Sequence, residues 1–371
     1  MVIGCVKEVK RYEFRVGMTP ENAKTYGSAG HKVYIQRGAG EGSSFTDAMY
    51  EAMGAEILET AEEVWAKSDM IVKVKEPLAE EYELMREGQI LYTFLHLAAD
   101  RPLTEKLLEK KVKAVAYETI EDKQGGLPVL KPMSEVAGRL SVQMGARCLE
   151  KPMGGMGLLL GGVPGVRRGN IVVIGGGVVG TSAMKMAIGL GGQVTVIDNN
   201  LDRLTYLDDV FWGQIQTIYS TPPAIEKAVS EADLVIGAVL IPGAAAPKLI
   251  KREYLKKMKP GSVIVDVAVD QGGCAETTRV TYHDDPTFVV DGVIHYCVAN
   301  MPGAVCQTST IALTNAALRY GKLIADLGLE AALRAEPGLV PGVNCYGGQM
   351  TYKAIADEFN LPYQDVMTMI E

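Results

Sequence analysis

Residues 171–200 constrain the fold of this chain more than any other stretch. The β-branched run IVVI leads into Gly175-x-Gly177-x-x-Gly180, followed by a helix-forming segment, a glycine-rich stop, a second β-run and Asp198. The first glycine permits a tight strand-to-helix turn, the second lets backbone amides approach a pyrophosphate, and the third lets helix and strand pack closely. This order predicts a β-α-β unit that binds a dinucleotide. A glycine-rich turn in a buried sheet with no ligand is the alternative interpretation.

The carboxylate of Asp198 indicates which dinucleotide the chain binds. Asp198 lies 23 positions after Gly175, at the end of the second predicted strand. An acid at this place can accept hydrogen bonds from the adenine-ribose hydroxyls and repels a 2′-phosphate. We therefore expect NAD rather than NADP.

Length, composition and charge exclude several functional classes. The chain has 371 residues, of which 47% are hydrophobic and 22% charged, as in an ordinary globular enzyme of about two domains. The net charge of −8 leaves no basic surface for nucleic acid or for an anionic membrane. The longest run without charged residues, 292–318, contains many polar residues, so we do not expect it to span a membrane.

The cysteines and the N-terminus indicate the compartment. No two of the six cysteines lie closer than nine positions apart, so no cysteine spacing typical of a metal site occurs. The first residues are too rich in charge for a secretory apolar core. We expect a cytoplasmic protein without a bound metal.

Segments with strand and helix patterns alternate on both sides of the dinucleotide motif, which implies parallel sheets. The sequence predicts an α/β fold of two domains. A Rossmann-type NAD domain, residues 130–306, is inserted into a discontinuous α/β substrate domain, residues 1–129 and 307–371. After residue 327 we expect proline- and glycine-rich segments and short helical segments.

Two basic residues are candidates for binding an acidic substrate. Arg15 lies between Phe14 and Val16, where its guanidinium is either a structural ion-pair donor or a clamp that holds a carboxylate through two parallel hydrogen bonds. Lys75 follows a predicted strand, and ligands of open α/β sheets collect at the carboxyl ends of strands. A solvated surface lysine is the alternative.

Three further residues at strand ends are candidates for acid–base chemistry. His96 ends a predicted strand, and the ordinary histidine pKa near 6.5 suits proton transfer; a buried structural histidine is the alternative. Glu118 ends the next strand and either orients a catalytic group or caps the sheet. Asp270 follows a buried β-run and precedes two glycines, so it either works beside His96 or forms a turn.

These residues lie in motifs that resemble a known family. The motifs are GCVKEVKRYEFRVGMTPENA, IVKVKEP, FLHLAADRPLTEKLL, AYETI, SVIVDVAVDQGGC and NMPGAV. With the glycine motif they resemble the family of bacterial L-alanine dehydrogenases, over nearly the whole chain up to about Leu327. The resemblance implies a two-domain subunit in a homohexamer.

The resemblance also implies a role for each candidate. Arg15 in EFRVG and Lys75 in VKVKEP would bind the substrate carboxylate and oxo group. His96 in HLAA and Asp270 in VDQGG would be catalytic, and Glu118 in YET would support them. The residues expected to contact NAD are Ser134, Gly175, Gly177, Val178, Val179, Gly180, Asp198, Arg203, Ser220, Val239, Leu240, Val267, Asp270, Val298, Asn300 and Met301.

The implied activity is the reversible NAD-dependent oxidative deamination of L-alanine to pyruvate and ammonia. The NAD-binding subunit of a proton-translocating transhydrogenase shares much of the pattern and is the nearest alternative. An opine-type amino-acid dehydrogenase would need room for a larger substrate. A non-enzymatic NAD-responsive binding protein would need no acid–base pair, whereas this sequence carries both His96 and Asp270.

Overall fold

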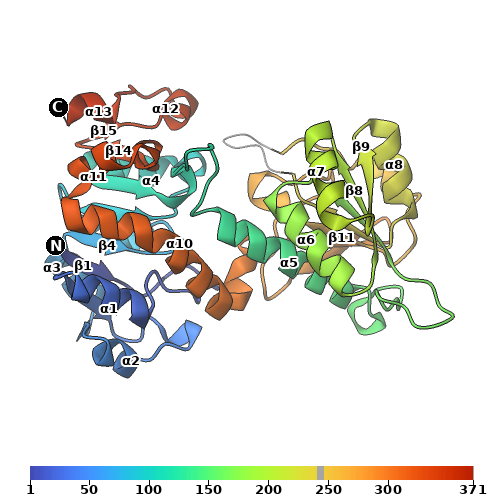
Figure 1. Ribbon diagram of the computed structural model, residues 1–371, viewed down its shortest axis with the longest axis horizontal. Helices are drawn as coiled ribbons and strands as arrows, with labels where there is room; N and C mark the ends of the chain where they lie inside the picture. The colour runs from blue at the N-terminus through green and yellow to red at the C-terminus, as the bar shows by residue number, and fades with distance from the viewer. Residues whose placement is uncertain (240–245, 371) are drawn as a thin grey trace. The chain divides into compact units, whose positions relative to one another are not determined.

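A computed structural model describes residues 1–239 and 246–370. The chain forms two compact units, which are described one at a time. The first unit comprises Met1–Met133 and Val305–Glu371, and the second comprises Ser134–Ala304. Each unit is a sheet with helices packed against it, so the predicted α/β fold with an inserted domain is confirmed (Figure 1). The expected NAD contact Leu240 lies outside the described residues.

The first unit contains an eight-stranded sheet in the order β15-β14-β6-β5-β4-β1-β2-β3. Strands β1 to β6 run parallel, β14 runs antiparallel to β6, and β15 runs antiparallel to β14. The strand order reverses between β1 and β4, a place where parallel sheets bind ligands beyond the carboxyl ends of their strands. The strands are β1 (Val2–Cys5), β2 (Lys32–Gln36), β3 (Glu56–Leu58), β4 (Met70–Val72), β5 (Ile90–Thr93), β6 (Lys113–Ala116), β14 (Val343–Tyr346) and β15 (Gln349–Met350).

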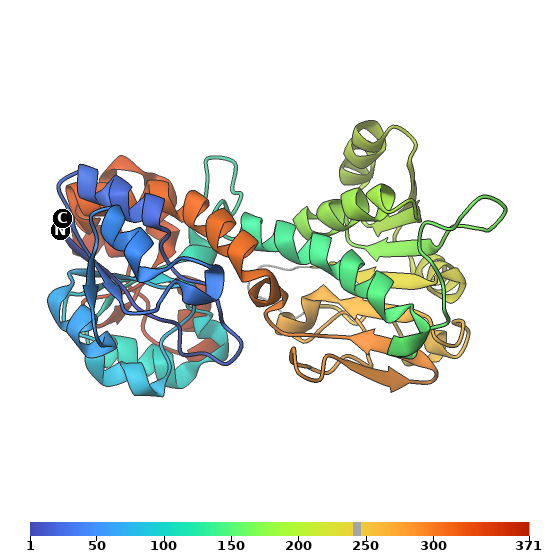
Figure 2. The ribbon, with the colours of Figure 1, turned by 90° about the horizontal axis from the view of Figure 1, so that it is seen from below.

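Helices cover both faces of this sheet (Figure 2). Buried Trp65, Leu103 and Ile355 join α3, α4 and α12 to one core. On another part of the sheet, the Tyr92 hydroxyl of β5 donates to the Ala317 carbonyl of α10 at 2.8 Å. The α-helices of this unit are α1 (Pro20–Ser28), α2 (Asp47–Ala52), α3 (Ala61–Lys67), α4 (Arg101–Glu109), α10 (Cys306–Leu327), α11 (Leu329–Ala335), α12 (Lys353–Phe359) and α13 (Val366–Met369).

The short helices expected after residue 327 are present as α11, α12 and α13, but the sequence analysis did not predict the two strands among them. Strands β14 and β15 form an antiparallel hairpin that extends the first sheet next to β6. Gly347 and Gly348 connect them, and both have positive φ, 57° and 83°. Two adjacent glycines are the residues that a two-residue hairpin turn of this kind favours, so the pair was a signal for the hairpin.

The second unit contains a seven-stranded sheet in the order β12-β13-β11-β10-β7-β8-β9. All pairs are parallel except β12 with β13. Its order reverses between β7 and β10, as in a dinucleotide-binding sheet. The strands are β7 (Asn170–Ile174), β8 (Gln193–Asp198), β9 (Ile215–Tyr219), β10 (Leu234–Gly237), β11 (Val263–Asp266), β12 (Thr287–Val290) and β13 (Val293–Tyr296).

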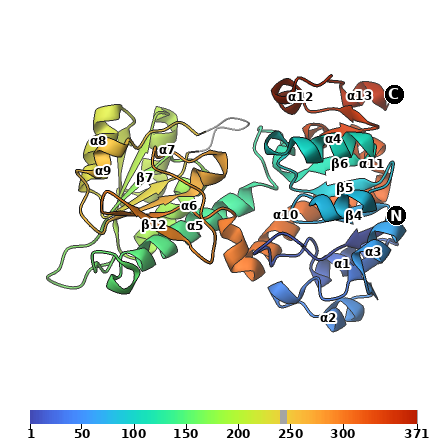
Figure 3. The ribbon, with the colours of Figure 1, turned by 180° about the vertical axis from the view of Figure 1, so that it is seen from behind.

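The helices of the second unit also cover both faces of its sheet. Helices α8 and α9 pack together beside the sheet (Figure 3). Their side chains share one core with β7, β10 and β11. Helix α5 packs so closely that a Cβ on Gly138 would lie 2.2 Å from the Val179 carbonyl oxygen in α6. The helices are α5 (Lys131–Cys148, of which Ser134 onward belongs to this unit), α6 (Val178–Gly189), α7 (Leu201–Phe211), α8 (Pro222–Glu231) and α9 (Arg252–Leu255). Within residues 1–239 and 246–370, no helix has the length and apolar character needed to cross a membrane.

Candidate active site

Four candidate residues follow four neighbouring strands of the first sheet. Arg15 comes after β1, Lys75 after β4 and His96 after β5, while Glu118 comes after β6. These strands lie side by side in the order β6-β5-β4-β1. Because they are parallel, their carboxyl ends meet at one edge of the sheet. The sheet therefore brings together candidates that are more than 100 positions apart in the sequence.

Lys75 and His96 are in direct contact. The Lys75 Nζ lies 3.2 Å from the His96 Nε2. An ammonium group has donors only, so Nε2 of a neutral imidazole accepts this hydrogen bond and the ring proton sits on Nδ1. Nδ1 faces the Glu118 carboxylate at 4.0 Å. The three residues form a row across β4, β5 and β6.

The backbone of His96 has an unusual conformation that the neighbouring residues hold in place. Its φ of 50° and ψ of 35° lie in the left-handed region. The Glu118 carboxylate accepts from the amides of Leu95 at 3.1 Å and His96 at 2.7 Å. The ring stacks on Phe94 with 3° between the planes. Glu118 thus fixes the backbone turn that carries the imidazole.

The electrostatic environment keeps the His96 imidazole neutral near pH 7. Burial among the surrounding protein atoms is the main cause that lowers the pKa of His96 well below 6.5. The positive charges of Lys75, Lys10 and Arg15 lower it further. The side chain nevertheless keeps 43% of its surface accessible, so water reduces the cost of burial. The direct contact with the Lys75 ammonium favours the same neutral form of the ring. A neutral imidazole is able to accept a proton.

Arg15 is buried and already has an anionic partner. Its side chain is 2% exposed, and its Nε donates to the Glu13 Oε1 at 2.7 Å while Nη2 donates to Oε2. A third nitrogen, Nη1, lies 3.1 Å from the Met133 sulfur. A bidentate pair of this kind fixes the plane of the guanidinium. The sequence analysis did not single out Glu13; an acid two positions before the candidate arginine was the available signal.

In the second unit the glycine motif forms the loop between β7 and α6. Gly175 has a φ of 99°, and a Cβ there would lie 2.7 Å from the Ala238 carbonyl oxygen beyond β10. A Cβ on Gly180 would lie 1.9 Å from the Gly175 carbonyl oxygen. At Gly177, which precedes the first turn of α6, no atom lies within 4 Å of such a Cβ. The loop is therefore closely packed on two sides and open at Gly177.

Asp198 and Arg203 lie against this loop. The Asp198 Oδ2 accepts from the Gly176 amide at 2.7 Å, and its Oδ1 accepts from the Asn200 amide at 2.8 Å. The Arg203 Nε donates to the Gly176 carbonyl at 2.6 Å. Asp198 is thus at the end of β8, as an acid that contacts an adenine ribose must be.

Asp270 lies on a short 3-10 helix, Val267–Gln271, after β11. The buried carboxylate of Asp266 holds both ends of this segment. It accepts from the amides of Ala268 at 3.1 Å and Cys274 at 2.8 Å, and from the Thr278 hydroxyl. The sequence analysis did not identify Asp266 as an anchor, because these partners become visible only in the folded chain.

The other expected NAD contacts occupy recurring positions of the second unit. Ser220, Val239, Val267 and Val298 follow the strands β9, β10, β11 and β13, so they lie at the same edge as the glycine loop. Val178 and Val179 begin α6, and Ser134 lies near the start of α5. Asn300 has a left-handed φ of 59°, while Met301 and Val298 are almost fully buried. Buried Val298 can offer a ligand little besides its backbone.

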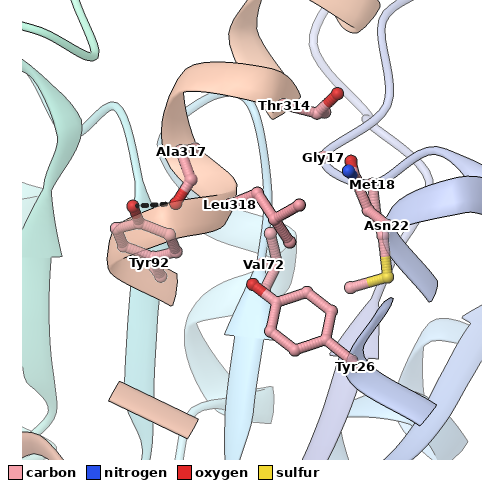
Figure 4. A pocket seen from close by; sticks show the side chains of 9 residues that line it. All are labelled: Gly17, Met18, Asn22, Tyr26, Val72, Tyr92, Thr314, Ala317 and Leu318. Atoms are coloured by element: carbon pink, nitrogen blue, oxygen red, sulfur yellow. Dashed lines mark hydrogen bonds between the residues drawn. The ribbon is translucent and has the colours of Figure 1, made fainter. Parts of the chain in front are cut away.

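A small pocket in the first unit lies apart from these candidates. It has a volume of about 10 Å³, room for about one water molecule. Tyr26, Tyr92 and Leu318 are among the residues that line it, and the hydrogen bond from Tyr92 to Ala317 runs along one side (Figure 4). None of the predicted site residues lines this pocket. Within the part of the chain that the structure describes, no group of three or more His, Cys, Asp and Glu side chains is arranged to hold a metal.

Comparison with known proteins relates the chain to one family. The model described as "Alanine dehydrogenase/PNT, N-terminal domain" matches residues 4–137, and "Alanine dehydrogenase/PNT, C-terminal domain" matches residues 141–353. An alanine dehydrogenase of Methanococcus maripaludis is 55% identical over 364 residues, which is 98% of either chain. An alanine dehydrogenase of Bacillus subtilis is 54% identical over 364 residues, 98% of this chain and 96% of that one.

Solved structures give a consistent picture of the fold. One called L-alanine dehydrogenase superposes with a TM-score of 0.94 at 51% identity, over 97% of this chain and 99% of that one. A transhydrogenase from Sinorhizobium meliloti superposes with a TM-score of 0.82 at 24% identity, over 95% and 100% of the two chains. At that identity the second match supports a shared fold alone.

Proposed function

The chain belongs to the alanine dehydrogenase/PNT family, and from that premise we propose that it converts L-alanine and NAD reversibly to pyruvate, ammonia and NADH. The resemblance inferred from the sequence motifs is thereby confirmed. The observation that carries the proposal is full-length identity above 50% to several alanine dehydrogenases. The arrangement of charged residues in the first unit supports it.

Arg15 binds the carboxylate of alanine or pyruvate in this proposal. Its bidentate contact with Glu13 through Nε and Nη2 fixes the plane of the guanidinium that would bind the substrate carboxylate. Binding at a fixed guanidinium orients the Cα–H bond of the substrate. Orientation of this bond is what hydride transfer requires.

His96 and Asp270 exchange the protons of the reaction. Loss of hydride from alanine leaves an iminium, to which water adds before ammonia departs. When substrate is bound, the Lys75 ammonium donates to the substrate oxygen instead of to His96, so the Nε2 of neutral His96 accepts a proton from the attacking water. Asp270 takes part in the transfer to the departing nitrogen. The Lys75 ammonium, 3.2 Å from the imidazole, stabilises negative charge on the substrate oxygen. Glu118 orients His96 through the backbone.

The second unit binds NAD, which accepts the hydride. Its glycine loop fits a pyrophosphate because the space beside Gly177 is open and the first amides of α6 point outward from the helix start. Asp198 receives the adenine ribose, with Arg203 beside it. Ser220, Val239, Val267 and Val298, at the ends of neighbouring strands, would hold the remainder of the cofactor.

A turnover assay on the purified protein tests this proposal. We expect NADH to form with L-alanine in the absence of any membrane fraction, and much less with L-serine, L-lysine or no amino acid. An enzyme that needs a membrane partner would indicate a transhydrogenase subunit. Binding of NADH without turnover of any amino acid would indicate a non-enzymatic binding protein.

We also propose that the chain acts in the cytoplasm as a homohexamer. The single chain exposes large apolar side chains, among them Leu159, Val163 and Trp212, which self-association could bury. Light scattering after size-exclusion chromatography measures the mass directly. A stable monomer at assay concentration would contradict this part of the proposal.

A further inference from the structure

A group of buried charged side chains includes Lys73, two positions before Lys75. The Lys73 side chain is fully buried, and its Nζ lies 2.8 Å from the Glu81 Oε1 and 3.4 Å from the Glu8 Oε2. Glu8 and Glu81 are themselves 1% and 2% exposed. Burying charges is costly unless they are paired, so such a group rarely occurs without a role in structure or chemistry. No step proposed above uses these three residues.

Glu8 connects this group to the segment that carries Lys75. The pairing of β1 with β4 ends at Cys5 and Val72. Beyond it, the Val74 amide has no strand partner on the β1 side, and the Glu8 Oε1 accepts from it at 2.6 Å. The Glu8 carboxylate therefore extends the contact on this side of β4 by two residues, to Val74, directly before Lys75.

The opposite side of the segment is tied to β5. The Lys73 amide donates to the Tyr92 carbonyl at 3.1 Å, and the Phe94 amide donates to the Val74 carbonyl at 3.3 Å. The Thr93 hydroxyl donates to the Lys75 carbonyl at 3.0 Å. With β5 holding one side of residues 73–75, the contact of the Val74 amide with Glu8 holds the segment from the other side.

We propose that Glu8 is a positioning residue for Lys75, that its charged carboxylate holds residues 73–75 in the arrangement needed for turnover, and that protonation loosens this hold. The role of Lys75 in this inference rests on the proposed function. A protonated carboxyl is a weaker acceptor for the Val74 amide than a carboxylate, and it also loses the charge that faces Lys73.

The surroundings of Glu8 place this change near neutral pH. Burial raises the pKa of Glu8 from 4.5 to about 7, although the positive charge of Lys73 acts in the opposite direction and lowers it. Further charges on Glu13 and Glu81 add to the increase. The titratable and charged groups that face Glu8 are Cys5, Glu13, Lys73, Glu81 and Tyr117.

The substitution Glu8→Gln tests the inference because it keeps an acceptor for the Val74 amide and remains uncharged at every pH. We would measure kcat/KM for pyruvate at saturating NADH and ammonium, and divide the kcat/KM of the unsubstituted protein by that of the variant. The ratio should be near one below about pH 6 and rise to roughly tenfold above about pH 8. A ratio that is constant across this range, at one or at any other value, overturns the inference.

Glu59→Gln is the matched control. Glu59 also pairs with a basic residue, Arg37, but this pair lies on the surface. The kcat/KM ratio for Glu59→Gln should therefore stay near one at every pH. Glu81→Gln is a second variant that leaves Glu8 in place. It removes a negative charge that favours protonation of Glu8, so its activity should persist to lower pH than that of the unsubstituted protein. An unchanged acid limit contradicts the inference even if Glu8→Gln fails to fold.

A second measurement needs no turnover. The rate at which an amine-reactive ester labels Lys75, relative to exposed Lys32, is read by peptide mass spectrometry. The relative rates should agree between the unsubstituted protein and Glu8→Gln below about pH 6 and differ severalfold above about pH 8. Equal rates throughout overturn the inference. Failure of the unsubstituted protein to oxidise L-alanine, with pH-dependent labelling intact, counts against the proposed function alone.

Discussion

His96 occupies a backbone conformation that costs a residue with a side chain about 1 kcal/mol or more. The cost is offset because Glu118 accepts two amides of the same turn, one of them from His96. The turn directs the imidazole toward Lys75 at the edge of the sheet. The β-run before His96 made the end of a strand predictable. The left-handed turn was not predictable, since it depends on a glutamate 22 positions later in the sequence.

Replacing His96 with alanine tests its catalytic role. We expect kcat for L-alanine oxidation to fall by roughly 10²- to 10⁴-fold, because proton transfer would lose its positioned acceptor. NADH affinity, followed by fluorescence titration, should stay within about twofold, since the expected cofactor contacts belong to the second unit. Near-normal turnover by this variant would remove His96 from the mechanism.

Lys10 offers a milder test of the charge around His96. Its positive charge contributes to the lowered pKa of His96, after burial and Lys75. Substituting Lys10 with glutamine removes that charge, so the pKa of His96 should rise toward its ordinary value. Since the neutral ring is the active form in deamination, the acidic limb of the kcat/KM profile should move to higher pH. A shift to lower pH, or none, would contradict the assigned electrostatics.

In the loop between β7 and α6, two glycines are required for two different physical reasons. Gly180 is needed for packing, because a Cβ there would lie 1.9 Å from the Gly175 carbonyl oxygen. Gly177 has free space around the same position and precedes the helix start. The two glycines look equivalent in the sequence motif, yet the structure gives them different physical roles.

Alanine substitutions at these two positions should therefore have different effects. Gly180→Ala should lower the free energy of unfolding by about 3 kcal/mol or more, because backbone atoms would have to move. Gly177→Ala should change it by less than about 1 kcal/mol while weakening NADH binding by roughly tenfold, since the methyl group occupies the approach to the pyrophosphate. Denaturant unfolding and NADH titration measure both quantities. Equal losses of stability would contradict this division of roles.

Some contacts in the site could not be predicted from the sequence and are seen only in the folded chain. The β-runs and glycines of residues 171–200 were enough to predict the order β7, α6, β8 and the acid that ends it. The acid two positions before Arg15 was a signal for the pairing of Glu13 with Arg15, whereas the contacts of Asp266 with the loop that bears Asp270 were not predictable. Those contacts depend on which backbone amides the folded loop turns toward Asp266, a property that local sequence does not carry.

At the scale of the whole molecule, both units use the same strand order around a central reversal. In the first unit the reversal lies between β1 and β4, next to Arg15 and Lys75; in the second it lies between β7 and β10, next to the glycine loop. The alternating pattern was sufficient to predict this class of fold. The hairpin of β14 and β15 escaped prediction because its strands are very short and gain their stability from pairing with β6.

Transfer of the alanine Cα hydrogen to NAD is the central claim, and deuterium measures it directly. L-Alanine deuterated at Cα is incubated with NAD and the purified protein, and the NADH is analysed by mass spectrometry, with His96→Ala as the inactive control. We expect NADH that carries one deuterium from the amino acid, formed together with pyruvate. NADH without deuterium, or pyruvate without NADH, would contradict the account.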